Sequence, residues 1–410
     1  MSNAKFIYQC CDCGKQYEST PELYLCPSCS AVNNPTTPPK GVFKTVYDYK
    51  SLSKSLNAKS LATSNYIDLL PLKSIDSLPP LRVGKTPLYT FKSIDGVKLP
   101  FNLLLKDDSQ NPTFSFKDRA SAVVSAYAKE NGIDTIVAAS TGNAGSSLAG
   151  ICASQGQKAI IMVPKAAPLA KLTQIVMYGA KIIPVDGTYD NAFDLSIEAT
   201  KEFGWYNRNT AFNPLTIEGK KTVSFEIFDQ LDGKTPDMVF VPVGDGVIVS
   251  GVYKGFEDLL MLGLIERIPT IIAVQSAGSS NLIDNINSKE FSIKPSNTIA
   301  DSISVDIPRN FYMAKQFIQN YKGETLAVSD EEIIQASAVL SRNTGIFAEP
   351  AAATAFAGML AYKTRGLIKA NSNCTVLLTG SGLKDLKAVS TLIQIPNPIS
   401  PNIEELKKLF

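Results

Sequence analysis

The sequence predicts an α/β protein in which helices cover both faces of parallel sheets. Strand-like and helix-like segments alternate over much of the 410-residue chain. The strand-like segments are continuous apolar runs, which is typical of strands buried on both faces of a parallel sheet. Small-residue turns follow several of these strands, as in β-turn-α units. At roughly 150 residues per domain, a chain of this length corresponds to two or three domains.

The order of the predicted elements supports this class. The predicted strands, each an apolar run, are residues 103–107, 134–140, 158–164, 181–186, 237–244, 269–276 and 374–380. The predicted helices are residues 120–132, 144–156 and 168–179, with a closing helix at 404–410. Residues 33–41 are rich in proline and indicate a short, stiff linker.

Three small-residue turns mark the expected ligand site. They are Ser140–Thr141–Gly142–Asn143, Gly244–Asp245–Gly246 and Thr379–Gly380–Ser381–Gly382, and each follows a predicted strand. Ligands of open parallel sheets bind at the carboxyl ends of the strands. We therefore expect these turns to meet around one site.

The composition excludes several classes of function. The chain contains no histidine, which excludes Ser-His-Asp and Cys-His nucleophile systems, histidine metal ligands and a histidine base. The net charge of +2 argues against bulk binding to nucleic acid or to an anionic membrane. We find no secretory signal and no apolar stretch of about 20 residues that would span a bilayer. With an odd total of seven cysteines, these features predict a protein of the reducing cytoplasm.

Two cysteine pairs near the N-terminus predict a structural zinc ribbon. Cys10 and Cys13 form the first Cys-x-x-Cys pair, and Cys26 and Cys29 form the second after twelve intervening residues. Each pair presents two thiolates to one tetrahedral ion, and four protein ligands leave no open position for catalysis. An empty or degenerate ribbon is the alternative. We do not expect Cys11 to be a ligand.

The segment Asn111–Pro112–Thr113–Phe114–Ser115–Phe116–Lys117–Asp118–Arg119 contains a lysine in an apolar turn before a helix. It could be a simple capping turn, with Lys117 and Arg119 in solvent and Asp118 favouring the helix N-terminus. Alternatively, a desolvated lysine has a depressed pKa and can form a Schiff base with a carbonyl cofactor.

This segment resembles the lysine motif of fold-type II pyridoxal-phosphate enzymes, and most closely that of the threonine synthases. Further matches in the same order, including the family's asparagine loop, phosphate loop and C-terminal motif, are residues 84–89, 140–143, 217–222, 241–251, 345–353 and 378–385. The resemblance implies a fold like that of the tryptophan synthase β subunit. That fold has two parallel-sheet α/β domains, to which this chain would add its small N-terminal zinc ribbon.

The resemblance also implies domain limits and partners. The zinc-ribbon-like module and linker would cover residues 1–40, the large cofactor-binding domain 41–124 and 216–410, and a smaller mobile domain 125–215. The expected partners are a small amino-acid substrate and a second copy of the chain in a homodimer, with neither nucleic acid nor membrane.

The resemblance assigns roles in binding pyridoxal 5′-phosphate. Lys117 would hold the cofactor as a Schiff base and then move protons between substrate carbons. Asn143 would donate a hydrogen bond to the 3′-oxygen, and Thr379 would face the pyridine nitrogen. The backbone N–H groups of Gly244, Asp245, Gly246, Val247 and Ile248, at a helix N-terminus, would bind the cofactor phosphate.

The predicted substrate site departs from the family pattern. Backbone N–H groups of Ser140, Thr141 and Gly142 would bind the substrate carboxylate. The family reads STGNT and NSVNPxRLEGQKT where this chain has Ala144 in place of threonine, Ala211 in place of serine and Thr216 in place of arginine. Replacement charge for the substrate phosphate would come from Lys171, our first choice, or from Arg208, Thr210, Lys220 or Arg309.

Three other positions bear on the site. Asp245 replaces a more usual asparagine, so its carboxylate must point away from the cofactor phosphate to avoid repulsion. Phe114 replaces a common glycine and would narrow the approach to Lys117. Glu349 fits a buried structural carboxylate and a site role equally well.

The leading functional prediction is a threonine synthase, a carbon–oxygen lyase that converts O-phospho-L-homoserine and water to L-threonine and phosphate. A lyase or dehydratase of the same fold, acting on another amino acid, is the alternative that the altered pocket leaves open. A third hypothesis is a catalytically silent binding protein that kept the fold, although the presence of Lys117 argues against it.

Overall fold

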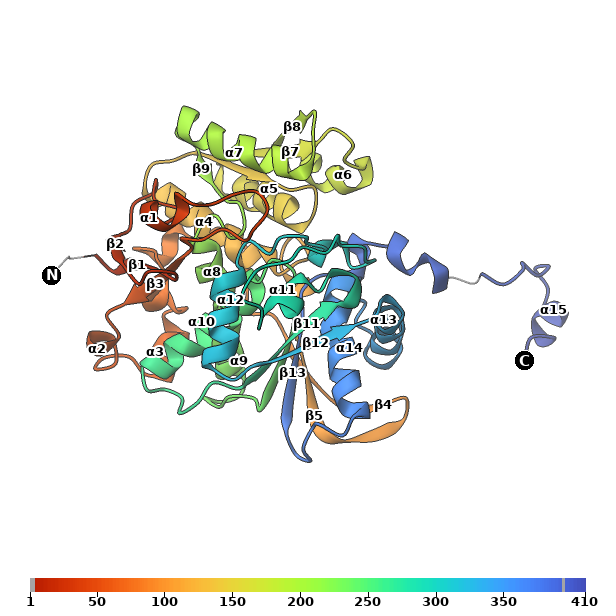
Figure 1. Cartoon of the computed structure of the whole chain (residues 1–410). Helices are drawn as coiled ribbons and strands as arrows, with labels where there is room; N and C mark the ends of the chain where they lie inside the picture. The colour runs from red at the N-terminus through yellow and green to blue at the C-terminus, as the bar shows by residue number, and fades with distance from the viewer. Residues whose placement is uncertain (1–3, 393–394) are drawn as a thin grey trace.

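Two parallel sheets and one small antiparallel sheet organise the chain (Figure 1). The structure is a computed structural model that describes residues 4–392 and 395–410. Helices cover both faces of the larger parallel sheet, so the predicted α/β class is confirmed. None of the described helices is long and apolar enough to cross a bilayer.

The larger sheet has six strands in the order β12-β11-β10-β13-β5-β4. All neighbouring pairs are parallel except the edge pair β4 and β5, which is an antiparallel hairpin. Its strands are β4 (Leu88–Ile94), β5 (Val97–Asp107), β10 (Met238–Pro242), β11 (Thr270–Ser276), β12 (Glu324–Val328) and β13 (Asn373–Leu378). β10 and β11 are in register at Val239 and Ile271.

The second sheet has four parallel strands in the order β8-β7-β6-β9. They are β6 (Thr135–Ala139), β7 (Lys158–Pro164), β8 (Lys181–Val185) and β9 (Tyr206–Asn207). This sheet lies at the top of the molecule, with α7 (Tyr189–Phe203) against it (Figure 1).

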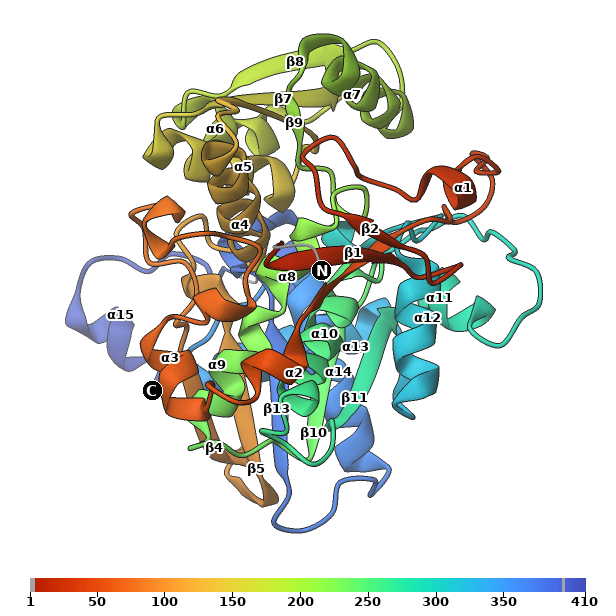
Figure 2. The same cartoon turned by 90° about the vertical axis from the view of Figure 1, so that its left-hand side faces the viewer.

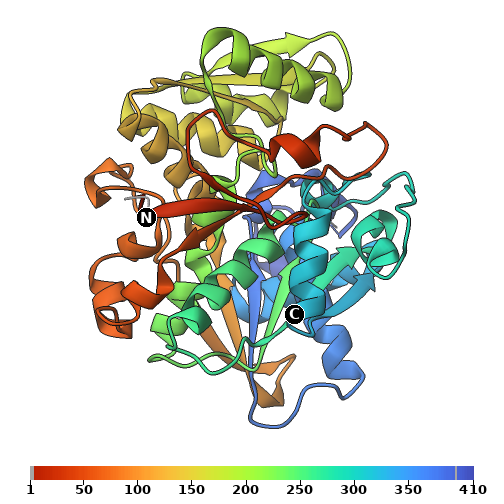
Figure 3. The ribbon, with the colours of Figure 1, turned by 60° about the vertical axis from the view of Figure 1, so that its left-hand side comes forward.

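The N-terminal segment forms a three-stranded antiparallel sheet in the order β2-β1-β3. Its strands are β1 (Phe6–Cys10), β2 (Gln16–Glu18) and β3 (Phe43–Tyr47). It lies between the two parallel sheets (Figures 2 and 3). Tyr24 stacks on Phe212 at a centroid distance of 4.6 Å, and Lys44 forms an ion pair with Glu257, so the module contacts both halves of the molecule.

The remaining elements are helices. The α-helices not yet given are α1 (Pro27–Ser30), α2 (Tyr49–Leu52), α3 (Ala58–Thr63), α4 (Lys117–Glu130), α5 (Asn143–Gln155), α6 (Leu169–Met177), α8 (Leu215–Lys220), α9 (Thr222–Gln230), α10 (Val247–Met261), α11 (Asn281–Asn285), α12 (Phe311–Asn320), α13 (Asp330–Thr344), α14 (Pro350–Thr364) and α15 (Ile403–Lys407). α15 lies apart from the sheets (Figure 1).

The central strands separate two apolar cores. Along β10, Val239 and Val241 belong to the core beneath α8, α9 and α10, whereas Phe240 belongs to the core beneath α13 and α14. Because successive side chains of a strand point to opposite faces, a strand covered on both faces must be apolar throughout. This is why the strands appear as unbroken apolar runs in the sequence.

One predicted boundary is wrong in a way that matters for function. The helix expected at 120–132 begins at Lys117 instead, so the lysine lies in the first helical turn and not before it. The carboxylate of Asp118 accepts hydrogen bonds from the backbone N–H and hydroxyl of Thr113. These hydrogen bonds hold the turn that precedes α4, so the helix begins three residues before the predicted start. The closing helix is also shorter than the predicted 404–410 and ends at Lys407.

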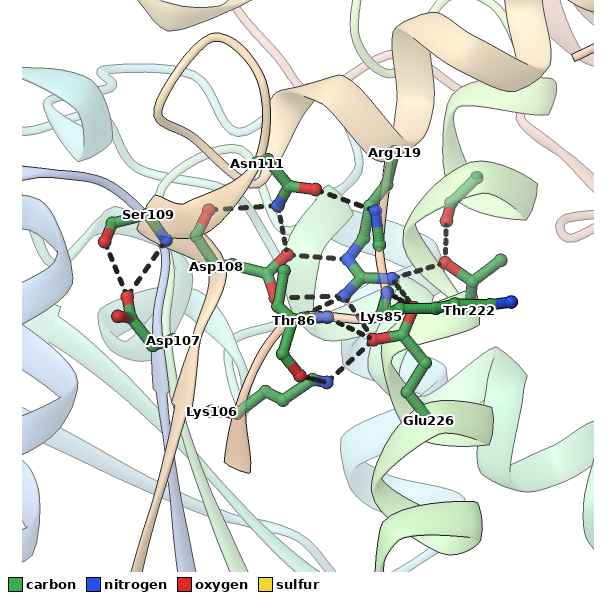
Figure 4. Close-up of polar contacts among 12 residues, drawn as sticks. Lys85, Thr86, Lys106, Asp107, Asp108, Ser109, Asn111, Arg119, Thr222 and Glu226 are labelled. Atoms are coloured by element: carbon green, nitrogen blue, oxygen red, sulfur yellow. Dashed lines mark hydrogen bonds and ion pairs between the residues drawn. The ribbon is translucent and has the colours of Figure 1, made fainter. Parts of the chain in front are cut away.

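A buried ion-pair network fixes the start of α4 (Figure 4). The Arg119 guanidinium lies 2.6 Å from Asp108 Oδ2 and 2.6 Å from Glu226 Oε1. Lys106 Nζ lies 2.7 Å from the other Glu226 oxygen and donates to the Thr86 carbonyl. Burial raises the pKa of Glu226, but Arg119 and Lys106 outweigh that effect and lower the pKa to about 2. The network joins α4 and α9 to the end of β5 and to the segment that precedes β4.

We predict that Arg119→Met strongly destabilises the protein. The methionine fills much of the same volume but leaves Asp108 and Glu226 buried without their main partner, which costs about 3–5 kcal/mol. Urea unfolding of the full chain measures this loss. Lys158→Met is the control, because Lys158 pairs with Asp134 on an exposed surface, where ion pairs contribute little. Equal unfolding midpoints for the two variants would contradict the prediction.

Candidate functional site

The lysine motif and the C-terminal motif lie side by side. The backbone N–H of Phe116 donates to the Thr379 carbonyl at 2.8 Å, and the N–H of Ser381 donates to the Phe114 carbonyl at 3.1 Å. Thr379 directly follows β13 and is buried as a residue, and its hydroxyl has no hydrogen-bond partner among the described residues. These contacts bring Lys117 and Thr379 to the same end of the large sheet although they are far apart in sequence.

Lys117 occupies a partly buried position at the first residue of α4. Its Nζ has no hydrogen-bond partner within residues 4–392 and 395–410. Burial lowers the pKa of Lys117, nearby Glu349 opposes this, and nearby Arg208 reinforces it. The amine therefore has a larger neutral fraction than a surface lysine, and the neutral form is the nucleophilic one.

Asn143 begins α5 and points at Glu349. Its side-chain amide lies 3.0 Å from each Glu349 carboxylate oxygen and 3.3 Å from Ser302 Oγ. Burial raises the pKa of Glu349, while Asn143 and then Lys117 act in the opposite direction. The sequence left the role of Glu349 open. The structure places it between Asn143 and Gly380, where a Cβ on the glycine would lie 2.4 Å from Glu349 Oε1.

Ser140, Thr141 and Gly142 form the turn before α5, but their N–H groups are not equally free. The N–H of Ser140 donates to the Met162 carbonyl, and the N–H of Gly142 donates to Ser140 Oγ, both at 3.2 Å. The N–H of Thr141 has no acceptor in the described part of the chain.

The turn from Gly244 to Ile248 leads from β10 into α10. Gly246 adopts φ +87°, which favours glycine. A Cβ at Gly244 would lie 2.9 Å from Ile303 Cα, so the loop has no room for a side chain there. The Asp245 carboxylate accepts a hydrogen bond from the backbone N–H of Arg309 at 3.3 Å. The 15-residue α10 directs its N-terminal N–H groups out of this turn.

These features fit a phosphorylated aldehyde cofactor. An unpartnered amine of lowered pKa suits Schiff-base formation. A glycine cradle at the start of a long helix suits a phosphate group, because N–H groups and the helix dipole both favour an anion.

The predicted anion-binding residues lie in different surroundings. Lys171 Nζ pairs with Asp301 at 2.7 Å and is partly exposed. Arg309 pairs with Asp190 and lies 4.2 Å from the ring centre of Phe193. Arg208 and Lys220 are fully buried, and neither forms an ion pair in the described part of the chain.

The positions that depart from the family pattern are also defined. Thr216 is buried on α8 and donates its hydroxyl hydrogen bond to the Asn213 carbonyl. Phe114 and Ala211 adopt φ +68° and +66°, values that L-residues other than asparagine and aspartate rarely adopt. The Phe114 side chain is 51% exposed.

One further lysine at the site had no predicted role. Lys384 Nζ donates to Ser146 Oγ at 3.0 Å and to Gln174. It therefore links the C-terminal motif to α5 and α6. The position of Lys384 within the matched segment 378–385 could have suggested a role at the site. Its partners could not be predicted locally, because they lie more than 200 positions away in the sequence.

The four predicted metal ligands converge. The sulfur atoms of Cys10, Cys13, Cys26 and Cys29 all lie within 4.8 Å of one another. The Cys13 and Cys26 sulfurs are 3.9 Å apart. With zinc–sulfur bonds near 2.3 Å, a tetrahedral site requires sulfur separations of roughly 3.8 Å. The four thiols therefore fit a zinc ion.

Comparison with known proteins identifies the family. The profile of the family described as "Pyridoxal-phosphate dependent enzyme" matches residues 80–380. The chain is 34% identical to a threonine synthase of Methanocaldococcus jannaschii, covering 98% of this chain and 99% of that one. It is 34% identical to a threonine synthase of Mycobacterium tuberculosis, covering 81% and 91%.

Solved structures support the fold. The chain matches the processed form of threonine deaminase isoform 2 from Solanum lycopersicum with a TM-score of 0.65, 22% identity and coverage of 82% and 90%. It matches maize serine racemase with a TM-score of 0.63, 24% identity and coverage of 73% and 89%. The resemblance inferred from the motifs is thereby confirmed: the chain belongs to the threonine synthase family of pyridoxal-phosphate dependent enzymes.

Proposed function

We propose that the protein is a threonine synthase, a carbon–oxygen lyase that converts O-phospho-L-homoserine and water to L-threonine and phosphate. The observation that carries this proposal is the 34% identity to a threonine synthase over almost the full length of both chains. The arrangement around Lys117 supports it, because the turns after β10 and β13 lie at the same end of the large sheet. Asn143, from the other sheet, reaches them through Glu349, whose backbone N–H donates to the Gly380 carbonyl.

The cofactor would be held by residues of both parallel sheets. Lys117 would supply the amine, the N–H groups of Gly244 to Ile248 would bind the phosphate, Asn143 would donate to the 3′-oxygen and Thr379 would hydrogen-bond the pyridine nitrogen. Pyridoxal phosphate, when bound, supplies an electron sink for carbanions at the substrate carbons. Asn143 must turn from Glu349, or share its amide, to reach a ligand.

The proton transfers fall to Lys117 Nζ. Its lowered pKa gives a larger neutral fraction than a surface lysine has, and the neutral amine can accept a proton from a substrate carbon. Glu349 stabilises the protonated amine by its nearby charge and so limits the fall in pKa. A single mobile amine that accepts and returns protons is sufficient, which is consistent with a chain that lacks histidine.

The substrate carboxylate would bind at the turn before α5. The free N–H of Thr141 is the most available donor, and the helix dipole of α5 adds to it. Ser140 and Gly142 would have to exchange their present acceptors for the carboxylate. Lys171 could reach the substrate phosphate only after leaving Asp301.

The domain organisation and the assembly are also proposals. We place the large cofactor-binding domain at 41–124 and 216–410 and a smaller, mobile domain at 125–215. The four-stranded sheet lies wholly within the smaller range. The pairs Lys171–Asp301 and Arg309–Asp190 cross between the two ranges and would break or shift as the small domain moves. We further propose a homodimer located in the cytoplasm.

We propose that Cys10, Cys13, Cys26 and Cys29 bind a structural zinc ion. The purified protein should then contain about one zinc per chain. Cys26→Ser should lose the metal and lower the thermal unfolding midpoint, because the ion contributes folding free energy to a small module. Elemental analysis and thermal unfolding measure these effects.

Cys11→Ser is the matched control for zinc, because Cys11 adjoins the site and is not one of the four converging thiols. It should retain the metal. Wild-type protein produced with adequate zinc but containing none would refute the zinc proposal.

Product analysis tests the proposed function. The wild type, loaded with cofactor and given O-phospho-L-homoserine, should release inorganic phosphate and threonine in equal amounts. Lys117→Ala should release neither at a comparable rate, because it lacks the only amine of the motif that can serve. Formation of a keto acid and ammonia from serine or threonine, without phosphate release from phosphohomoserine, would instead establish the lyase or dehydratase alternative.

A further inference from the structure

The amine of Lys220 is buried without a partner among the residues that the structure describes. Lys220 is the last residue of α8, and its side chain is fully buried. The adjacent Lys221 is equally buried but lies 2.7 Å from Asp258 and is also paired with Glu218. Because an unpaired buried charge is strongly unfavourable, a buried amine without an anion is driven towards its neutral form. The contrast between the two lysines therefore requires an explanation.

Arg208 is a second buried cation without a carboxylate partner. Among the described residues its guanidinium donates hydrogen bonds to neutral oxygens alone, although the Asp118 carboxylate lies nearby: the acceptors are Ser121 Oγ at 3.1 Å, Thr210 Oγ1 at 2.8 Å and the Lys117 carbonyl at 3.5 Å. Burial lowers the pKa of Arg208 to about 10. The contact with the Lys117 carbonyl places this charge at the start of α4, next to the site.

Lys220 and Arg208 are close enough for the charge of one to affect the pKa of the other. Burial holds the pKa of Lys220 well below its usual range, and the nearby charges of Arg208 and Lys117 lower it further, whereas Asp245 opposes them. Lys220 packs beneath α10, because a Cβ at Gly251 would lie 2.7 Å from Lys220 Cβ. Lys220 therefore lies against the helix that begins at the glycine cradle, and Arg208 lies at the start of α4 beside Lys117.

The sequence pattern agrees with this placement. Thr216 and Lys220 are four residues apart on α8, so they lie on the same face of the helix. The family pattern has arginine at the first position and glutamine at the second. This chain has lost a cation at 216 and carries one a single turn further along.

We propose that Lys220 and Arg208 form a cationic pair that binds a phosphate dianion at the site, supplied either by the cofactor or by the substrate. A dianion would neutralise both buried charges and accept charge-assisted hydrogen bonds from them. The inference deepens the proposed function and rests on it for the substrate phosphate. The cofactor phosphate would serve equally in any enzyme of this family.

The test uses full-length Lys220→Met and Arg208→Met in two binding experiments. In the first, protein stripped of cofactor is titrated with pyridoxal 5′-phosphate and with pyridoxal, which lacks the phosphate. In the second, cofactor-loaded protein is melted in inorganic phosphate and in chloride of equal ionic strength. The wild type should prefer the phosphorylated cofactor and be stabilised by phosphate.

In the first experiment, we expect the ratio of the affinities for pyridoxal 5′-phosphate and pyridoxal to fall by at least about tenfold, as for a lost charged hydrogen bond. In the second, we expect phosphate no longer to raise the unfolding temperature above its value in chloride. Each variant should show at least one of these two losses. A loss in the first experiment assigns the pair to the cofactor phosphate, and a loss in the second assigns it to the substrate phosphate. Lys220→Met should also unfold at the same or a higher temperature than wild type when cofactor and phosphate are absent, because the buried unpaired charge is gone.

Lys158→Met is the control, since Lys158 is exposed and paired with Asp134, and it should retain both preferences. Wild-type phosphate preference in both experiments for Lys220→Met would overturn the proposal. A lower unfolding temperature of that variant without ligands would also overturn it, because Lys220 would then be structural. Neither experiment requires turnover, so these outcomes are independent of whether phosphohomoserine is the substrate.

Discussion

The rest of the structure depends on the buried Arg119 network. The guanidinium joins Asp108, at the end of β5, to Glu226 on α9, and Lys106 closes the network from the strand itself. Because Arg119 is two residues beyond Lys117 on the same helix, whatever fixes Arg119 also fixes the backbone of the lysine. A rigid support of this kind holds the backbone of Lys117 in place while its long side chain moves.

Around the start of α4, residues from distant parts of the chain form one site. Some of their polar groups are paired with each other and others have no partner. Asn143 and Glu349 are hydrogen-bonded to each other, whereas Lys117, Lys220 and the Thr379 hydroxyl have no such partner within the described residues. Buried polar groups are normally satisfied, so an unpartnered amine such as that of Lys220 beside the site marks a place where a ligand would complete the structure. The unpaired groups are two amines and a hydroxyl. Amines suit a ligand that carries negative charge, and the hydroxyl suits a ring atom that forms hydrogen bonds.

Local sequence predicted much of this arrangement. Unbroken apolar runs identified β5, β6, β7, β8, β10, β11 and β13 but missed β4, β9, β12 and the three strands of the N-terminal sheet. The spacing of Cys10, Cys13, Cys26 and Cys29 predicted a cluster that does form. The pairing of Asn143 with Glu349 spans 206 positions, and no local pattern encodes it. The ion pair of Lys171 with Asp301 and the burial of Lys220 likewise depend on tertiary packing. The early start of α4 was missed because Asp118 satisfies the preceding turn.

The central claim is that Lys117 is the residue to which the cofactor attaches. Borohydride reduction of the cofactor-loaded protein, followed by proteolysis and mass spectrometry, tests it directly. We expect one phosphopyridoxyl modification per chain, located on Lys117, with Lys220 and Lys384 unmodified. A modification on another lysine, or none in protein that has bound the cofactor, would contradict it.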